Sequence, residues 1–359
     1  MKSKRIFWVT LLAAFLACGM LASCGGDDHQ TPPALSGDGG DDDGGDGGDG
    51  GDDGQDEDGY PAGLTVETFT DELSGGGECL GFYAVVDFKA NPKLLFRPKF
   101  SGAKTPTTYF ADFAESGEGT PYVVVNGGYF GGSTSVSLLI EEGEMKSMAA
   151  RSDVCNGQTY YPVRAAFGQM ADGSFETTWV YCLRAADNSF YPYAYPSPLD
   201  NDERTETFMP EPPTETTAGA YVWEPQYAIG AGPMLVYEGE NVAEENYWKE
   251  VFEHGGVSGM SRHPRTALGA TADGKLVVLV CDGRGKRGST GFTLPELADK
   301  MISLGCVRAI NLDGGGSSTF VGKEGTVLNM PSDTDGTTLE GATIKERSIP
   351  TAVVIAEAK

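Results

Sequence analysis

The chain has 359 residues and a formal net charge of −26, and leaving out the thirteen acidic and three basic residues before position 60 still gives −16. A domain that is acidic in its own right repels the phosphate backbone, so nucleic acid is excluded as the expected partner. The roughly 300 residues after position 59 are enough for one large domain, and no linker-like break interrupts them.

The first residues have the composition of a secretory signal. Three basic residues precede an apolar run from 6 to 21, which is too short and wrongly flanked for a membrane-spanning helix. The Leu-Ala-Ser-Cys that ends at Cys24 resembles a bacterial lipobox, which implies removal of residues 1–23 and lipidation of Cys24. The acidic residues that follow resemble a surface-sorting tract. We therefore expect a bacterial outer-membrane lipoprotein, exposed at the cell surface and held to the membrane by its lipid.

Residues 24–59 are dominated by Gly and Asp. Such a segment has no apolar surface to bury and repels itself, so we expect a disordered, extended tether. Gly-Asp repeats raise the question of Ca²⁺ binding. However, the segment lacks interleaved apolar positions, and its spacing fits no EF-hand loop.

Residues 60–359 read as a strand-rich α+β fold: a single domain with a mixed β-sheet and few helices. Apolar runs bounded by turn residues predict strands, and Asp273-Gly274 predicts a hairpin between two of them. The predicted strands cover 81–88, 121–125, 137–140, 227–237, 265–271, 275–281, 307–310 and 349–355.

The main helix is predicted at residues 294–304. Thr293 and Glu296 have the spacing of a capping box, Pro295 fits the first turn, and Gly305 ends the helix. Its apolar residues recur at helical spacing, which predicts a face packed on the core beneath the strand that leads to Asp313.

Residues 151–222 form an expected insertion that is rich in Tyr and Pro. Their rings could stack on sugars, or the segment could simply pack on the flank of the domain. Five cysteines follow Cys24, so at most two disulfides can form. Cys155 and Cys182 could pair, whereas Cys281 and Cys306 are expected in the core.

Polar residues and glycines follow several predicted strands. They are Asn126-Gly127-Gly128, Asp282-Gly283-Arg284 and the stretch from Asp313 through three glycines to Ser317 and Ser318. Each alone could be an ordinary turn. Their repetition predicts loops that converge on one pocket, in which the glycine amides line an anion site beside Asp313.

An ordered set of motifs resembles the phosphodiester glycosidase family, and the match covers most of 120–356 outside the insertion. The motif at 311–318, Asn-Leu-Asp-Gly-Gly-Gly-Ser-Ser, is the most specific one. The resemblance implies hydrolysis of a sugar-1-phosphodiester, such as one of N-acetylglucosamine, to free sugar and a phosphomonoester. The other motifs lie at 126–130, 265–269, 282–284, 292–298, 331–333 and 347–351.

Cleavage of the C–O bond passes through an oxocarbenium-like state, around which a pair of carboxylates is expected. We expect Asp313 to be the nucleophile or base, with Asp282 or Glu141 as the second carboxylate. The phosphate leaves as a stable anion, which lowers the demand for a general acid.

The same chemistry needs donors for the phosphate and a surface for the sugar. Arg265 and Arg347 could form charge-assisted bonds to the phosphate, and the amides of Gly314, Gly315 and Gly316 could add further donors. Ser317 and Ser318 belong to the same predicted binding loop. Asn126 is expected to orient the substrate, and Tyr129 offers a stacking face.

Three alternatives stay open at this point. A Ca²⁺ could be held by Asp313, Asp282 and carbonyls, and a metal phosphodiesterase would then break the P–O bond. A surface lipoprotein could also bind glycans without turning them over. His263 could be a general base, although nothing near it in the sequence orients it and a plain loop residue is the simpler expectation.

Overall fold

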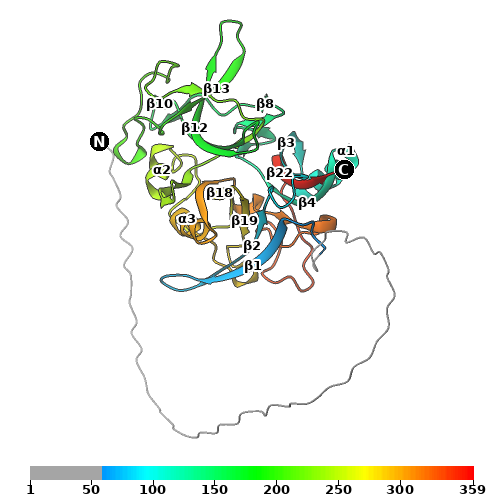
Figure 1. The fold of residues 1–359 in the computed structure, drawn as a ribbon. Coiled ribbons are helices and arrows are strands. Elements are labelled where there is room, and N and C mark those ends of the chain that lie inside the picture. The colour runs from blue at the N-terminus through cyan, green and yellow to red at the C-terminus, as the bar shows by residue number, and fades with distance from the viewer. Residues whose placement is uncertain (1–58) are drawn as a thin grey trace, which may run out of the picture. The chain divides into compact units, whose positions relative to one another are not determined.

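The computed structural model describes residues 59–359, so the predicted signal peptide, Cys24 and the Gly/Asp-rich tether lie outside the described residues. Strands predominate in this part, and three α-helices pack against them (Figure 1). No described helix is both long enough and apolar enough to cross a bilayer. The strand-rich domain with few helices that the sequence predicts is present.

The first sheet has seven strands and carries the loop of Asp313. The predicted hairpin at Asp273-Gly274 is confirmed, because β18 and β19 pair with Arg265 opposite Cys281. One face of this sheet packs against α2 (Ala243–Lys249) and α3 (Leu294–Ser303). Its strands are, in order, β1 (Leu64–Glu72), β2 (Glu78–Val86), β19 (Leu276–Cys281), β18 (Arg265–Thr271), β20 (Cys306–Asn311), β16 (Met234–Tyr237) and β17 (Glu240–Asn241).

The second sheet shows that the segment 151–222 is an integral part of the domain. The segment supplies four of the seven strands, and Tyr181 and Tyr195 are buried in the main core. The strands are, in order, β14 (Tyr221–Val222), β13 (Phe190–Tyr195), β12 (Phe175–Arg184), β11 (Arg164–Gln169), β15 (Tyr227–Gly230), β7 (Leu139–Glu141) and β8 (Glu144–Ser147).

The third sheet has four strands and is covered by α1 (Pro106–Ser116), whose buried Tyr109 and Phe113 pack on it. Two short hairpins complete the domain, and one of them, β9 with β10, comes from the segment 151–222. The strands of the third sheet are, in order, β21 (Phe320–Val321), β4 (Gly119–Asn126), β22 (Ile349–Ala358) and β3 (Leu94–Lys104), and the hairpins are β5 (Phe130–Gly131) with β6 (Thr134–Ser135) and β9 (Asp153–Cys155) with β10 (Gln158–Tyr160).

The prediction of a mixed sheet is wrong. Every ladder between these strands is antiparallel, and the one parallel pairing in residues 59–359 is the isolated bridge between Glu78 and Ser289. Many partners, such as β18 and β19, are joined by short turns, and a short turn allows only antiparallel pairing.

The predicted helix is confirmed as α3. Thr293 Oγ1 accepts from Glu296 N at 3.2 Å, and Glu296 Oε2 accepts from Thr293 N at 2.9 Å, which completes the capping box. Its buried residues Leu294, Leu297 and Met301 pack in the same cluster as Ala309 of β20. The helix therefore supports the strand that leads to Asp313, as predicted.

The cysteines form no disulfide. All five within residues 59–359 are free and buried, so Cys155 and Cys182 do not pair. The Cys182 thiol instead lies 3.8 Å from the Met145 sulfur in a separate apolar cluster. Cys281 and Cys306 are core residues, as expected.

Candidate active site

Asp313 lies where the ends of three strands meet. Asp313 N donates to Gly127 O at 3.1 Å, and the Asn126 side-chain amide at the end of β4 donates to Asp313 O at 2.6 Å. The preceding Leu312 N donates to Thr266 O at 2.8 Å. Because its backbone is held on both sides, the Asp313 side chain has a fixed position.

The three glycines after Asp313 are explained by crowding. A Cβ on Gly316 would collide with the Arg347 guanidinium and the Asp333 carboxylate, and one on Gly314 would lie 2.8 Å from Pro264 O. Gly315 has φ +62°, which side chains rarely adopt. The glycines therefore let the Arg347–Asp333 pair and the loop of Pro264 pack directly against the bend.

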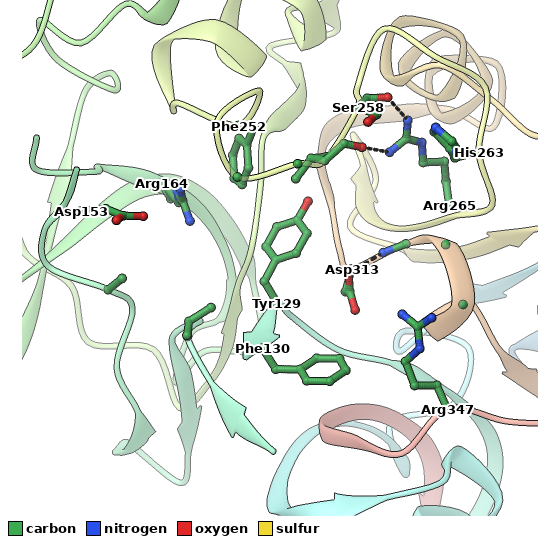
Figure 2. A pocket seen from close by; sticks show the side chains of 18 of the residues that line it. Tyr129, Phe130, Asp153, Arg164, Phe252, Ser258, His263, Arg265, Asp313 and Arg347 are labelled. Carbon is green, nitrogen blue, oxygen red and sulfur yellow. Dashed lines mark hydrogen bonds between the residues drawn. The ribbon is translucent and has the colours of Figure 1, made fainter. Parts of the chain in front are cut away.

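A cavity of about 460 Å³ opens beside this bend (Figure 2). Figure 2 shows Asp313 between the side chains of Tyr129 and Arg347, with Arg164 and Asp153 at the other side of the view. The lining residues are Tyr129, Phe130, Val136, Ala150, Asp153, Arg164, Phe252, Gly255, Gly256, Val257, Ser258, His263, Arg265, Arg284, Asp313, Gly314, Gly315, Gly316 and Arg347.

The surroundings of Asp313 change the pKa of its carboxyl group. Burial raises its pKa to about 6, although the hydrogen bond from Ser317, the Gly314 amide and the charge of Arg347 all favour the ionised form. The Gly314 N–H donates to Asp313 Oδ1 at 2.9 Å. A half-buried carboxyl group with a pKa near 6 at the wall of a cavity is suited to act as a general base or nucleophile.

Arg265 lines the cavity as predicted, but most of its donors are already used. It is 2% exposed, and its guanidinium donates to four carbonyls, those of Phe292, Val257, Ser258 and Ser261, at 2.9–3.3 Å. Three of these carbonyls belong to the loop that forms one wall. Arg265 therefore holds the cavity wall in place, and few of its N–H groups remain free to bind a phosphate.

Arg347 and Arg284 present charge to the cavity. Arg347 forms a bidentate pair with Asp333 at 2.9 and 3.0 Å, and its Nη1 lies 3.5 Å from Ser317 Oγ. Arg284 contacts only a hydroxyl, Ser332 Oγ, at 3.3 Å and pairs with no described carboxylate. Arg284 lies within a motif that the sequence singled out, yet it was not among the predicted binding residues.

Tyr129 and Asn126 have different places. The Tyr129 hydroxyl donates to Gly232 O and accepts from the Asn311 amide, both at 2.8 Å, and its ring lines the cavity. Asn126 is fully buried behind Asp313, where its Oδ1 accepts from Thr266 Oγ1 at 2.7 Å. It positions the bend and does not line the cavity.

Ser317 and Ser318 are also fully buried and lie outside the cavity lining. The hydrogen bond from Ser317 lowers the pKa of Asp313, while Ser318 Oγ accepts from Thr266 at 3.3 Å. Both serines therefore support the glycine bend on its buried side and do not contact the cavity.

The structure does not bring the two expected partners of Asp313 into the cavity. Asp282 is fully buried, and its Oδ1 accepts from Met330 N at 2.8 Å and from Asn329 Nδ2 at 3.1 Å, so it holds a neighbouring loop. Glu141 lies on β7, where it accepts from Phe100 N at 2.7 Å and pairs with Lys99 at 3.7 Å.

The pair of Asp282 and Asp313, considered as possible Ca²⁺ ligands, is not assembled, because the two carboxyl groups face different surroundings. Within residues 59–359, no three His, Cys, Asp or Glu side chains are grouped so as to hold a metal ion. The carboxylates that do line the cavity are Asp313 and, at its exposed rim, Asp153.

Sequence reasoning missed three lining residues and undervalued a fourth. His263 lines the wall with Arg265, its Nδ1 is buried without a partner among the described residues, and its pKa is lowered by burial and by Arg265 and Arg284. Its side chain is therefore neutral at pH 7 and lies at the cavity wall. Asp153 and Arg164 carried no motif that separates them from surface charges, whereas Arg284 lay within the motif at 282–284 but was not among the predicted binding residues.

Comparison with known proteins identifies a shared family. A family model for phosphodiester glycosidases matches residues 119–356, which is most of the described domain. The N-acetylglucosamine-1-phosphodiester α-N-acetylglucosaminidases of cattle and human are 46% and 45% identical over 69 residues, and an uncharacterised prophage-derived protein of Bacillus subtilis is 44% identical over 72. These matches cover 19–20% of this chain and only 11–13% of the relatives.

Solved structures share the fold over a much longer stretch. The zebrafish N-acetylglucosamine-1-phosphodiester α-N-acetylglucosaminidase catalytic domain, auto-inhibited by its pro-peptide, is similar with a TM-score of 0.52 at 19% identity, over 84% of this chain and 86% of that one. A hypothetical protein from Synechocystis reaches a TM-score of 0.51 at 16% identity, over 82% of this chain and 62% of the other. At these identities, the similarity establishes the fold alone.

Proposed function

The chain belongs to the phosphodiester glycosidase family, a family of hydrolases, and from that premise we propose that it hydrolyses a sugar-1-phosphodiester to free sugar and a phosphomonoester. The observation that carries this proposal is the position of Asp313, a half-buried carboxyl group of raised pKa at the wall of a cavity that also presents arginines. The sequence further leads us to propose that this activity lies at a bacterial cell surface, anchored through Cys24.

The phosphodiester binds at the wall of Arg284 and Arg347. Arg284 has no carboxylate partner among the described residues, so its donors are available to phosphate oxygens. Arg347 is already paired with Asp333, which fixes its direction and leaves Nη1 toward the bend. In a chain with net charge −26, an anionic substrate needs such local donors.

Asp313 takes a proton from a water molecule that attacks the anomeric carbon, or it attacks this carbon itself and forms a glycosyl ester that water then hydrolyses to free sugar. The bond between this carbon and the bridging oxygen breaks, and the electron pair leaves with the phosphate. A phosphomonoester is stable as an anion and needs little help from a general acid. One carboxylate therefore suffices for this bond cleavage, which fits a cavity from which Asp282 and Glu141 are absent.

The two rival functions have weaker support. The P–O route of a metal phosphodiesterase needs ligands grouped around an ion, and the described residues contain no such group. A glycan-binding protein without turnover would not need a half-buried carboxyl group with a raised pKa at the cavity wall. Its main sequence support also weakens, because Tyr160, Tyr181 and Tyr195 are buried in the core.

Hydrolysis in ¹⁸O-labelled water tests the proposal. The purified protein is incubated with the methyl phosphodiester of N-acetylglucosamine-1-phosphate, and the products are examined by mass spectrometry. We expect release of the sugar with the label on its anomeric oxygen. Label in the phosphate would show P–O cleavage, and the absence of any turnover would support the binding protein.

The pH profile of kcat/KM should fall on the acid side with a midpoint near pH 6. Asp313 must be ionised to act, and its pKa of about 6 means that protonation removes activity as the pH drops through that value. His263 is the other titratable group at this wall, so the same profile is measured for His263→Gln. The midpoint should persist there, and its disappearance would assign the acid limb to His263.

A further inference from the structure

The cavity has two unlike ends. Arg284, Arg347 and the glycine bend form the end assigned above to phosphate. Asp153, Arg164 and Phe252 line a different part of the wall, and Figure 2 shows them across Tyr129 from Arg347. Asp153 and Arg164 come from the Tyr- and Pro-rich segment 151–222, for which neither the motifs nor the comparisons provide a role.

The side chain of Arg164 is held in place by carbonyl groups and an aromatic ring, without an ion pair to a described carboxylate. Its Nε donates to Glu250 O at 3.3 Å, its Nη2 donates to Val251 O at 3.2 Å, and its guanidinium lies over the Phe252 ring, 4.4 Å from the centroid. No described carboxylate lies within ion-pair distance, and Nη1 donates to no described acceptor. A fixed guanidinium with free donors is suited to binding a ligand at low entropic cost.

Asp153 supplies acceptors at the same end. It begins the short hairpin of β9 and β10 and is exposed at the rim of the cavity. Its Oδ1 accepts from Val154 N at 2.8 Å, and its Oδ2 lies 3.4 Å from the Tyr160 hydroxyl. Carboxylate oxygens have about four lone-pair sites in total, so acceptor capacity remains.

We propose that Arg164 and Asp153 form a subsite for sugar hydroxyl groups, which selects the sugar of the phosphodiester. Arg164 donates to a hydroxyl oxygen and Asp153 accepts from a hydroxyl group, a combination that matches groups able to do both. A second anionic group on the ligand would be attracted by the charge of Arg164 but repelled by the carboxylate of Asp153. This inference depends on the proposed function in one respect only, namely that the bound sugar is joined to a phosphate.

Separate binding measurements for the two ends test the subsite. Isothermal titration calorimetry with N-acetylglucosamine and with inorganic phosphate is carried out on the wild type and on Arg164→Lys and Asp153→Asn. We expect both substitutions to raise the Kd of the sugar by about tenfold or more, because each removes hydrogen bonds to the sugar, while the Kd of phosphate changes less than about twofold.

Arg151→Lys is the matched control. Arg151 also donates to a carbonyl, Cys182 O at 2.9 Å, and also lies over aromatic rings, those of Tyr181 and Phe190, but it does not line the cavity. Its substitution should leave both affinities unchanged. A loss of sugar affinity in this control would show that loosening the segment is enough, and would overturn the assignment.

The remaining outcomes are equally decisive. If Arg164→Lys weakened phosphate and spared the sugar, this end would be an anion site. If the wild type did not bind the sugar, or if the exposed Asp153→Asn bound it normally, the subsite would be wrong. If the sugar bound with the expected dependence but the wild type released none from its phosphodiester, the proposed function would fail and the subsite would stand.

Discussion

Asp313→Asn should lower the turnover of a sugar-1-phosphodiester by about 10³-fold or more while the domain remains folded. The amide keeps the volume and can still accept from the Gly314 N–H, but it can neither attack the anomeric carbon nor take a proton from water. Because burial raises the pKa of Asp313 to about 6, the charged form is costly at pH 7. The neutral variant should therefore melt no lower than the wild type.

The measurement compares kcat at saturating substrate with the thermal melting curve of each protein. Asp282→Asn is the matched control, since it changes another carboxylate that the sequence proposed. The amide oxygen of Asp282→Asn can still accept from Asn329 and Met330 outside the cavity, but the variant loses the ion pair with Arg287 at 3.4 Å. Stability should therefore fall by at most about 1–3 kcal/mol, and kcat should stay within a fewfold range. Near-normal turnover by Asp313→Asn would remove this residue from the chemistry.

Local signals predicted the parts of the fold that depend on neighbouring residues. The capping box at Thr293 and the turn at Asp273-Gly274 specify their elements through contacts a few residues apart, and both are present. The pairing of strands that lie far apart in the sequence, such as β2 with β19, depends on distant contacts, so local patterns did not show that every ladder is antiparallel. The segment 151–222 was expected to be an insertion, yet its strand β11 pairs with β15 outside the segment and joins it to the rest of the second sheet, a contact that no local pattern predicts.

The convergence of loops was predictable, whereas the direction of each side chain was not. Tyr129, Arg265, Asp313 and Arg347 line one cavity although they are far apart in the sequence. Asp282 has the same sequence context as Asp313, an apolar strand before it and glycine after it. Only the tertiary contacts with Asn329 and Met330 turn Asp282 away from the cavity, and no sequence pattern encodes that.

Glu250 is the strongest example of a structural role that the sequence concealed. It follows α2 in a stretch rich in acidic residues, yet its side chain is fully buried. Its Oε1 accepts from Met234 N at 2.8 Å and from Trp179 Nε1 at 2.9 Å, and its Oε2 accepts from Ala165 N at 2.8 Å. Met234 belongs to the first sheet and the other two donors to the second, so one carboxylate joins the sheets behind the cavity.

Glu250→Ala should therefore destabilise the domain by about 3–5 kcal/mol, because it leaves three buried donors unpaired. The free energy of unfolding is measured in urea. Glu245→Ala, on the preceding helix α2, is the control: its carboxylate is exposed and pairs only with Lys249, so the expected change is below about 1 kcal/mol. A loss of similar size in both variants would show that the helix, and not the buried carboxylate, carries the effect.

The pH dependence of stability provides an independent readout. Burial raises the pKa of Glu250 from 4.5 to about 7, so the unfolded chain loses this proton at a lower pH than the folded one. Between about pH 4.5 and 7, Glu250 holds more of its proton in the folded state, so raising the pH lowers the contribution of this residue to the free energy of unfolding. Glu250→Gln cannot titrate, so its stability should fall less steeply than that of the wild type over this range. Equal slopes would mean that Glu250 ionises alike in both states, and that its three hydrogen bonds fully offset its burial.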